Sequence, residues 1–193
     1  MDNGASSYRR FLEGDDDGVV EIIKDYKDGL MLYLNNYVQN IHIAEDLMED
    51  TFVRIVVKKP RFSGKSSFKT WLYAIGRNIA VDYVRKNAKV CEISAEEASN
   101  IIKDETDVEK EYLKDERKIL LHKTLANLNT DYRTVIYLIY FENFSIAETA
   151  DIIKKSYKQT ENLVYRAKKS LKSKLETEGF VYEELYRNSR QRV

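Results

Sequence analysis

The sequence predicts an all-α protein made of two small helical units joined by a flexible acidic linker. Apolar residues recur at helical spacing through most of the 193 residues, which is the pattern of amphipathic helices. Only one proline and seven glycines occur, too few turn residues for a fold of many short strands. Between residues 88 and 108 the helical pattern stops and acidic residues accumulate, which indicates the linker.

The first unit is expected to bury one small core between three helices. The apolar stripes place these helices at residues 18–41, 44–57 and 67–86. A loop that contains Pro60 and Gly64 separates the second helix from the third.

The second unit is expected to have four helices and a helix–turn–helix rhythm. They are placed at residues 109–128, 132–141, 145–153 and 157–175. Ser145 and Glu148 form the pattern of a capping box, and a similar pattern at Ser94 suggests a short turn in the linker. The turn before the last helix usually holds a glycine. Here Lys154 must adopt a costly conformation, or the turn differs.

These elements predict four segments along the chain, at residues 1–87, 88–108, 109–175 and 176–193. The first and third are the helical units, and the last is a C-terminal extension. We expect the two units to move relative to one another about the linker.

Composition narrows the class of protein. No apolar run reaches 18 residues and the N-terminus has no apolar signal core, so we expect a cytoplasmic protein without membrane insertion. The single Cys91 excludes an internal disulfide and a cysteine-based zinc site, and the two histidines are isolated. We expect no cofactor, no metal site and no catalytic residue.

Charges are segregated along the chain although the net charge is zero. Residues 1–57 carry 5 basic and 12 acidic side chains, whereas residues 58–89 carry 9 basic and 1 acidic. Residues 90–131 carry 6 basic and 11 acidic side chains, and residues 132–193 carry 12 basic and 8 acidic. Two basic blocks favour two contacts with a polyanion, the alternative being chance segregation on solvated helices.

The segment "SGKSS" (63–67) looks like the end of a phosphate-binding loop. Such a loop needs a glycine five residues before Gly64, where this chain has Lys59 followed by Pro60. Lysine rarely adopts the backbone angles that glycine supplies, and proline removes a donor amide. An ATP-dependent enzyme is therefore the weakest hypothesis.

The basic stretch suits single-stranded nucleic acid instead. On a helical wheel of residues 67–86, Lys69, Tyr73 and Arg77 lie opposite the apolar arc, and Asn78, Asp82 and Arg85 form a second polar stripe. Such a helix, preceded by a basic loop, can track backbone charge and stack bases on aromatic rings. Trp71 lies within the apolar arc and is expected in the core, so Tyr73 is the better stacking candidate.

Two other helices carry notable polar faces. In "IAEDLMEDTFVR" (43–54) acidic residues repeat four positions apart, which favours a basic protein partner or a solvated acidic helix equally. The helix at 157–175 has one apolar stripe and is otherwise basic, with asparagine, glutamine and arginine that can read base edges. Its alternative is a plain surface helix.

Together, "AEDLMEDTFVRI" (44–55), "FKTWLYAIGRNIAVDYVRK" (68–86) and "LNTDYRTVIYLIYFENFSIAETADII" with "TENLVYRAKKSL" (128–171) resemble a bacterial sigma factor. The similar group is the extracytoplasmic-function (ECF) group of the sigma-70 family, and the resemblance covers roughly residues 19–87 and 110–175. It implies a region 2 bundle of three to four helices and a region 4 helix–turn–helix.

The resemblance also implies partners and roles. The acidic helix would dock on the β′ clamp helices of core RNA polymerase, the second unit would meet the β flap, and group membership suggests an anti-sigma factor. The matching core-binding residues are Asp46, Leu47, Glu49, Asp50 and Phe52. The residues matching the promoter −10 element are Phe62, Lys65, Ser66, Lys69, Tyr73, Arg77, Asn78 and Arg85. Those matching the −35 element are Lys158, Gln159, Glu161, Asn162, Tyr165 and Arg166.

The chain departs from the family pattern at Lys154, Lys155, Glu161 and Leu163, which leaves the −35 sequence open. The leading hypothesis is a sigma factor that directs promoter-specific initiation with core polymerase. The alternative is a free-standing helix–turn–helix regulator, which would recognise DNA without core. The sequence names neither the promoter nor the inducing signal.

Overall fold

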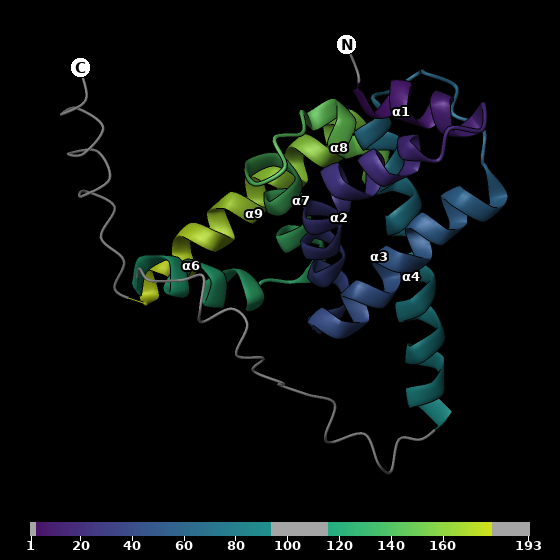
Figure 1. Ribbon diagram of the computed structural model, residues 1–193. Helices are drawn as coiled ribbons and strands as arrows, with labels where there is room; N and C mark the ends of the chain where they lie inside the picture. Colours follow the sequence, from purple (N-terminus) through teal and green to yellow (C-terminus); the bar gives the residue numbers. More distant parts are fainter. Residues whose placement is uncertain (1–2, 94–115, 179–193) are drawn as a thin grey trace, which may run out of the picture.

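The computed structural model describes residues 3–93 and 116–178 (Figure 1). Within these ranges the chain forms helices and no strand, so the predicted all-α class is confirmed. The first unit contains α1 (Asn3–Leu12), α2 (Asp17–Val38), α3 (Ile41–Lys58) and α4 (Phe68–Ile93). The second contains α6 (Glu116–Ala126), α7 (Thr130–Tyr140), α8 (Ile146–Ile153) and α9 (Tyr157–Thr177). The turn expected at Ser94 lies outside the described residues.

Helix α1 is an element that the sequence analysis did not predict. It is too short to show a sustained stripe, yet its Tyr8 and Phe11 are buried. The Tyr8 hydroxyl donates to the carbonyl oxygen of Pro60 at 2.7 Å. This bond ties α1 to the loop that precedes α4.

The helix ends in the first unit follow from capping groups. The Asn40 side chain accepts from the backbone amides of His42 and Ile43, which starts α3. Gln39 and Lys59 have positive φ and end α2 and α3 in the left-handed conformation. The expectation that Lys59 avoids such backbone angles was therefore wrong. The loop after it nevertheless follows a helix rather than the strand that a phosphate-binding loop requires.

The second unit has the predicted capping groups around a helix–turn–helix. Ser145 and Glu148 form the predicted capping box at α8, and Ser156 forms another with Gln159 at α9. Lys154 takes the left-handed conformation, with φ 56° and ψ 46°. The glycine-like turn is therefore made by a lysine, at the expense of some backbone strain.

The two units pack against each other in this structure. Helix α4 contacts α8, and α2 contacts α7 (Figure 1). The Tyr73 ring of α4 lies 5.1 Å from Tyr33 of α2 and 5.1 Å from Phe144 of the second unit, centre to centre. The hydrophobic core is therefore continuous across the two units. Among the described helices, none is both long and apolar enough to cross a membrane.

Candidate nucleic-acid interface

The loop at residues 59–67 is an open basic segment beside a cluster of aromatic rings. Gly64 has φ +70°, and a Cβ added there would meet no atom within 4 Å, so this part of the loop faces open space. Lys65 is exposed. The half-buried Phe62 ring lies 5.3 Å from Trp71 and 5.7 Å from Phe68, which anchors the start of the loop. Basic and aromatic groups thus lie together, as single-stranded nucleic acid requires.

Tyr73 does not lie where the helical wheel suggested. Its expected exposure is wrong: the side chain is 1% exposed because the turn between α7 and α8 covers this face of α4. The hydroxyl donates to Glu142 Oε2 at 2.7 Å. Burial, and then the Glu142 carboxylate, raise the pKa of Tyr73 well above its ordinary value, so it remains a hydrogen-bond donor. Trp71 was expected in the core. Its side chain packs against the core residues but is only half buried.

Two further basic side chains of α4 lie on later turns of the helix. Arg77 and the exposed Arg85 line a groove of about 330 Å³ between the two units. Lys155 and Asp131 line the opposite side. Arg85 also pairs with Asp82 at 3.1 Å, and Asn78 is half buried. The predicted residues Phe62, Lys65, Ser66, Lys69, Tyr73, Arg77, Asn78 and Arg85 thus follow one loop and one helix, with differing exposure.

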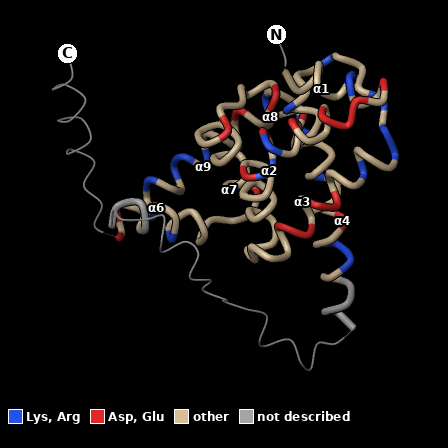
Figure 2. Tube along the Cα trace, in the orientation of Figure 1, with Lys and Arg blue, Asp and Glu red and all other residues tan. Residues whose placement is uncertain are grey.

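Helix α9 separates an apolar face from a polar one. Leu163, Val164 and Ala167 are buried against the second unit. Tyr165 is 69% exposed, and Lys158, Asn162 and Arg166 are also exposed. Figure 2 shows basic residues along this helix. An exposed helix that follows a helix–turn–helix turn and carries these groups can enter the major groove of duplex DNA.

Four of the predicted α9 contacts already have partners within the chain, and one of these is Arg166, whose Nε donates to the backbone carbonyl oxygen of Asn162 at 3.4 Å. The Gln159 side chain accepts from the Ser156 backbone amide at 2.9 Å as part of the capping box. Glu161 accepts from Lys158 at 2.8 Å. These two bonds use Gln159 Oε1 and Glu161 Oε2, so a base contact without exchange of partners must use Gln159 Nε2 or Glu161 Oε1. Asn162, Tyr165 and Arg166 are exposed, and Arg166 keeps its two Nη groups for a base.

The acidic face of α3 lies on the surface, but not all of its predicted docking residues do. Asp46, Glu49 and Asp50 are exposed, and Figure 2 shows acidic residues on this helix. Leu47 and Phe52 are 3% and 5% exposed, because they point into the core of the first unit. They anchor α3 in the core of the first unit and leave almost no surface for a partner protein in this conformation.

Sequence reasoning missed an apolar extension of this face. Val53 and Val57 are 56% and 67% exposed on the turns that follow Glu49 and Asp50. Val53 lies four residues after Glu49, and Val57 lies four residues after Val53, and this helical spacing is the signal that could have found them.

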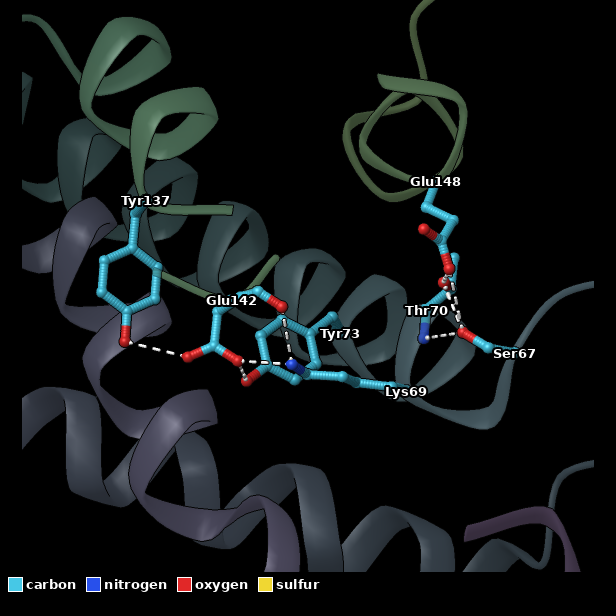
Figure 3. Close-up of polar contacts among 7 residues, drawn as sticks. All are labelled: Ser67, Lys69, Thr70, Tyr73, Tyr137, Glu142 and Glu148. Atoms are coloured by element: carbon cyan, nitrogen blue, oxygen red, sulfur yellow. Dashed lines mark hydrogen bonds and ion pairs between the residues drawn. The ribbon is translucent and has the colours of Figure 1, made fainter. Parts of the chain in front are cut away.

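Sequence reasoning also missed a set of polar contacts between the units. The Lys69 ammonium lies 2.8 Å from Glu142 Oε2, and Ser67 and Thr70 both contact Glu148 (Figure 3). These partners are 73 to 81 positions apart along the chain. Lys69 and Glu148 carried sequence signals, for DNA binding and for capping, and neither signal indicated a contact between the units.

Comparison with known families agrees with this geometry. Residues 22–90 match the model of sigma-70 region 2, and residues 118–171 match that of sigma-70 region 4. Together the two matches cover more than half of the chain. The fold and its polar surfaces therefore define a two-region transcription initiation factor.

Similar proteins have the same organisation. The chain is 28% identical to the ECF RNA polymerase sigma factor SigW of Bacillus subtilis over 175 residues, covering 86% of this chain and 94% of SigW. It is also 28% identical to SigM of the same organism over 153 residues, covering 79% and 92% of the two chains. A solved structure of the sigma factor RpoE with the anti-sigma factor NepR from Bartonella quintana shares the fold, with a TM-score of 0.64 and 24% identity. That likeness covers 81% of this chain and 95% of RpoE.

The chain belongs to the sigma-70 family, in its ECF group. It is a sigma factor that directs promoter recognition by RNA polymerase, and it is not an enzyme. Family membership thus favours the leading sequence-based hypothesis over the free-standing regulator.

Proposed function

We propose that the loop at residues 59–67 and the α4 face beside it bind the opened −10 element. The observation that carries this assignment is the open basic loop held beside half-buried Phe62. Backbone phosphates would meet Lys65 and Lys69, and an unstacked base would meet the ring of Phe62. Ser66, Asn78, Arg77 and Arg85 extend the same surface along α4. Tyr73 joins it only after the second unit has moved away.

The second unit would read the −35 element as duplex DNA. Asn162, Tyr165 and Arg166 are the exposed groups that would contact base edges. Lys158 and nearby lysines would neutralise phosphates. Gln159 and Glu161 would join through Nε2 and Oε1, the atoms that their bonds to Ser156 and Lys158 do not use.

The acidic face of α3 would dock on the β′ clamp helices of core polymerase. Asp46, Glu49 and Asp50 supply exposed negative charge, and Val53 with Val57 supplies apolar area beside it. Leu47 and Phe52 hold this face in position from within the core. The second unit would contact the β flap. The protein would act in the cytoplasm, where core polymerase lies.

An anti-sigma factor is a further proposed partner. RpoE was solved with NepR, and CnrH, which shares the fold at a TM-score of 0.62 and 20% identity, was solved with the cytosolic domain of CnrY. The groove between the units, lined by Arg77, Arg85 and Lys155, would suit an amphipathic acidic segment.

The test is promoter-dependent transcription with purified core polymerase on a pool of candidate promoter fragments. We expect transcripts that start at discrete sites only when core and this protein are both present. Aligning those starts gives the −10 and −35 sequences. Specific duplex binding by the protein alone, without directed initiation, would contradict the proposal.

A further inference from the structure

The hydroxyl of Tyr8 joins α1 to the loop at residues 59–67. It donates to the backbone carbonyl oxygen of Pro60 at 2.7 Å, and Tyr8 is 1% exposed. Because a buried hydroxyl needs a partner within the protein, this bond favours one position of the loop backbone over others. The bond lies close to the end of α3, where the loop begins.

The Tyr8 ring contacts the aromatic cluster that supports the same loop. Its centre lies 5.3 Å from that of Trp71 and 5.5 Å from that of Phe68. Phe62, the loop residue proposed to meet an unstacked base, packs on the same two rings at 5.3 and 5.7 Å. Tyr8 therefore acts on the loop in two ways, directly through Pro60 and indirectly through the rings beneath Phe62.

A second residue of α1 contacts the first residue of the loop. The Lys59 ammonium lies 4.7 Å from the centre of the Phe11 ring, and Phe11 is 4% exposed. Lys59 ends α3 with φ 42°, so its left-handed conformation sets the direction in which the chain leaves the helix. The attraction between a cation and an aromatic face stabilises this arrangement. Helix α1 thus contacts two successive residues at the start of the loop.

Helix α1 is itself fixed on α2. The Ser7 hydroxyl donates to Glu21 Oε2 at 2.7 Å. Arg10 lies 2.7 Å from Asp15 Oδ2 and 3.1 Å from Glu21 Oε1. A Cβ added at Gly18 would clash with the Ser7 carbonyl oxygen, so the two helices are in backbone contact there. A helix held in this way can set the position of a loop instead of following it.

We propose that Tyr8 is a positioning residue for strand capture, and that α1 holds the loop at residues 59–67 in the conformation that receives the −10 strand. This role rests on the strand-binding function proposed above for the loop. The match to sigma-70 region 2 begins at residue 22, after α1 ends, so the role adds an element to the matched segment. Without α1 the loop would be ordered only when the strand binds, and that entropy cost would lower the affinity for the strand.

The first test follows the loop in the free full-length protein. Tyr8→Phe removes the hydroxyl and keeps the ring. The matched control Ser7→Ala removes the neighbouring hydroxyl of α1, whose bond goes to Glu21 rather than to the loop. Trp71 is the only tryptophan of the chain and lies against both Tyr8 and Phe62, so its fluorescence reports on the contacts beneath the loop.

We expect acrylamide to quench the tryptophan of Tyr8→Phe more strongly than that of the parent, because the loop and its phenylalanine leave the indole more often. Ser7→Ala should be quenched like the parent. Equal quenching in all three proteins would show that the Tyr8 hydroxyl does not hold the loop. An equal increase in both variants would show only a general loosening of α1. Either result overturns the proposal.

The second test measures promoter opening by holoenzyme. A promoter found in the transcription assay carries 2-aminopurine in its −10 element, so its fluorescence reports strand separation. We expect Tyr8→Phe to slow opening about fivefold, which corresponds to one net hydrogen bond, and Ser7→Ala about twofold or less. Affinity for core polymerase and for the closed promoter should not change. Equal slowing by the two variants, or a loss of core affinity that accounts for the slowing, contradicts a positioning role.

A loop variant separates failure of the proposal from failure of the function on which it rests. Lys65 is exposed, so Lys65→Ala should fold like the parent. If Lys65→Ala opens the promoter at the parental rate, the strand-binding function of the loop fails, and the positioning role fails with it. If Lys65→Ala slows opening and Tyr8→Phe does not, only the positioning role fails.

The combination of Tyr8→Phe with Lys65→Ala gives a result that a purely structural role would not produce. A displaced loop has already lost part of its Lys65 contact with the strand. We therefore expect the two effects on opening to be less than additive, whereas Ser7→Ala and Lys65→Ala should add. Full additivity of Tyr8→Phe and Lys65→Ala would mean that Tyr8 does not act through the loop, which overturns the proposal.

Discussion

The Arg133 guanidinium of α7 donates twice to the backbone carbonyl oxygen of Asn36 in α2, at 2.7 Å from Nη2 and 3.1 Å from Nε. The same side chain donates to the carbonyl oxygens of Ala126 and Leu128, both at 2.9 Å. Arg133 is 6% exposed, and burial lowers its pKa without removing its charge. Its acceptors are carbonyl oxygens near helix ends, where the helix dipole favours a cation. One side chain thus fixes the α6–α7 turn and joins the two units.

We predict that Arg133→Met lowers the free energy of unfolding by about 2–4 kcal/mol. The carbonyl oxygens of Asn36 and Leu128 lose the Arg133 donor, whereas that of Ala126 still accepts from Gln39. Urea denaturation followed by circular dichroism measures the change. Arg166→Met at an exposed position is the control and should change stability by about 0.5 kcal/mol or less. A loss below about 1 kcal/mol for Arg133→Met would show that water replaces these bonds.

Combining Asp46→Lys with Glu49→Lys should weaken binding to core polymerase at least about tenfold, since the proposed docking face reverses its charge. Titration of labelled protein with core measures the affinity. The control combines Asp25→Lys with Asp28→Lys, which makes the same charge change at exposed positions of α2. Equal affinities of both variants would place the docking face elsewhere.

Substitutions on α9 should separate base reading from phosphate binding. Arg166→Ala is expected to reduce the free energy of promoter binding by about 1–3 kcal/mol. It should also reduce the discrimination between bases at one base pair of the −35 element. Lys169→Ala should weaken binding to all promoter sequences alike. It should also reduce the slope of log affinity against log salt concentration by about one. Holoenzyme binding to promoter variants at several salt concentrations measures both. Identical behaviour of the two variants would argue against α9 as the reading helix.

Glycine in the turn between α8 and α9 should stabilise the protein. Lys154 has positive φ, so Lys154→Gly relieves backbone strain and should stabilise the protein by about 0.5–1 kcal/mol. Asp151→Gly, inside α8 and also exposed, should instead destabilise by a similar amount. Thermal unfolding of the two variants distinguishes strain relief from a general effect of glycine. If Lys154→Gly destabilises the protein, the proposed backbone strain at Lys154 is contradicted.

Glu148 should make stability depend on pH in the acid range. Its pKa in the folded protein is below the ordinary value of 4.5, so its stabilising contribution is complete above that value. The contribution is lost as the pH falls through the folded pKa. We expect Glu148→Gln to be less stable than the parent at pH 7, and the difference to shrink below pH 4.5. Denaturation curves across this range test it, and a constant difference would rule out titration of Glu148.

The sequence determined the helices, because their information is local. Apolar spacing located α2, α3 and α9, and the Ser145–Glu148 pair marked the start of α8 before any contact was known. At the turn, the sequence left two alternatives, a costly conformation at Lys154 or a different turn, and the structure has the first. Helix α1 was not predicted, because its ten residues form too few turns to show a clear apolar stripe.

Only the tertiary structure determined which polar faces are covered. A helical wheel shows where Lys69 and Tyr73 point relative to their own unit, but not whether another unit lies there. Glu142 covers them from 69 or more positions away, and no periodicity relates residues so far apart. Leu47 and Phe52 likewise matched a docking motif, yet the packing of α3 turned them inward. Local spacing fixes a helix and its faces, whereas the exposure of each face depends on contacts between distant segments.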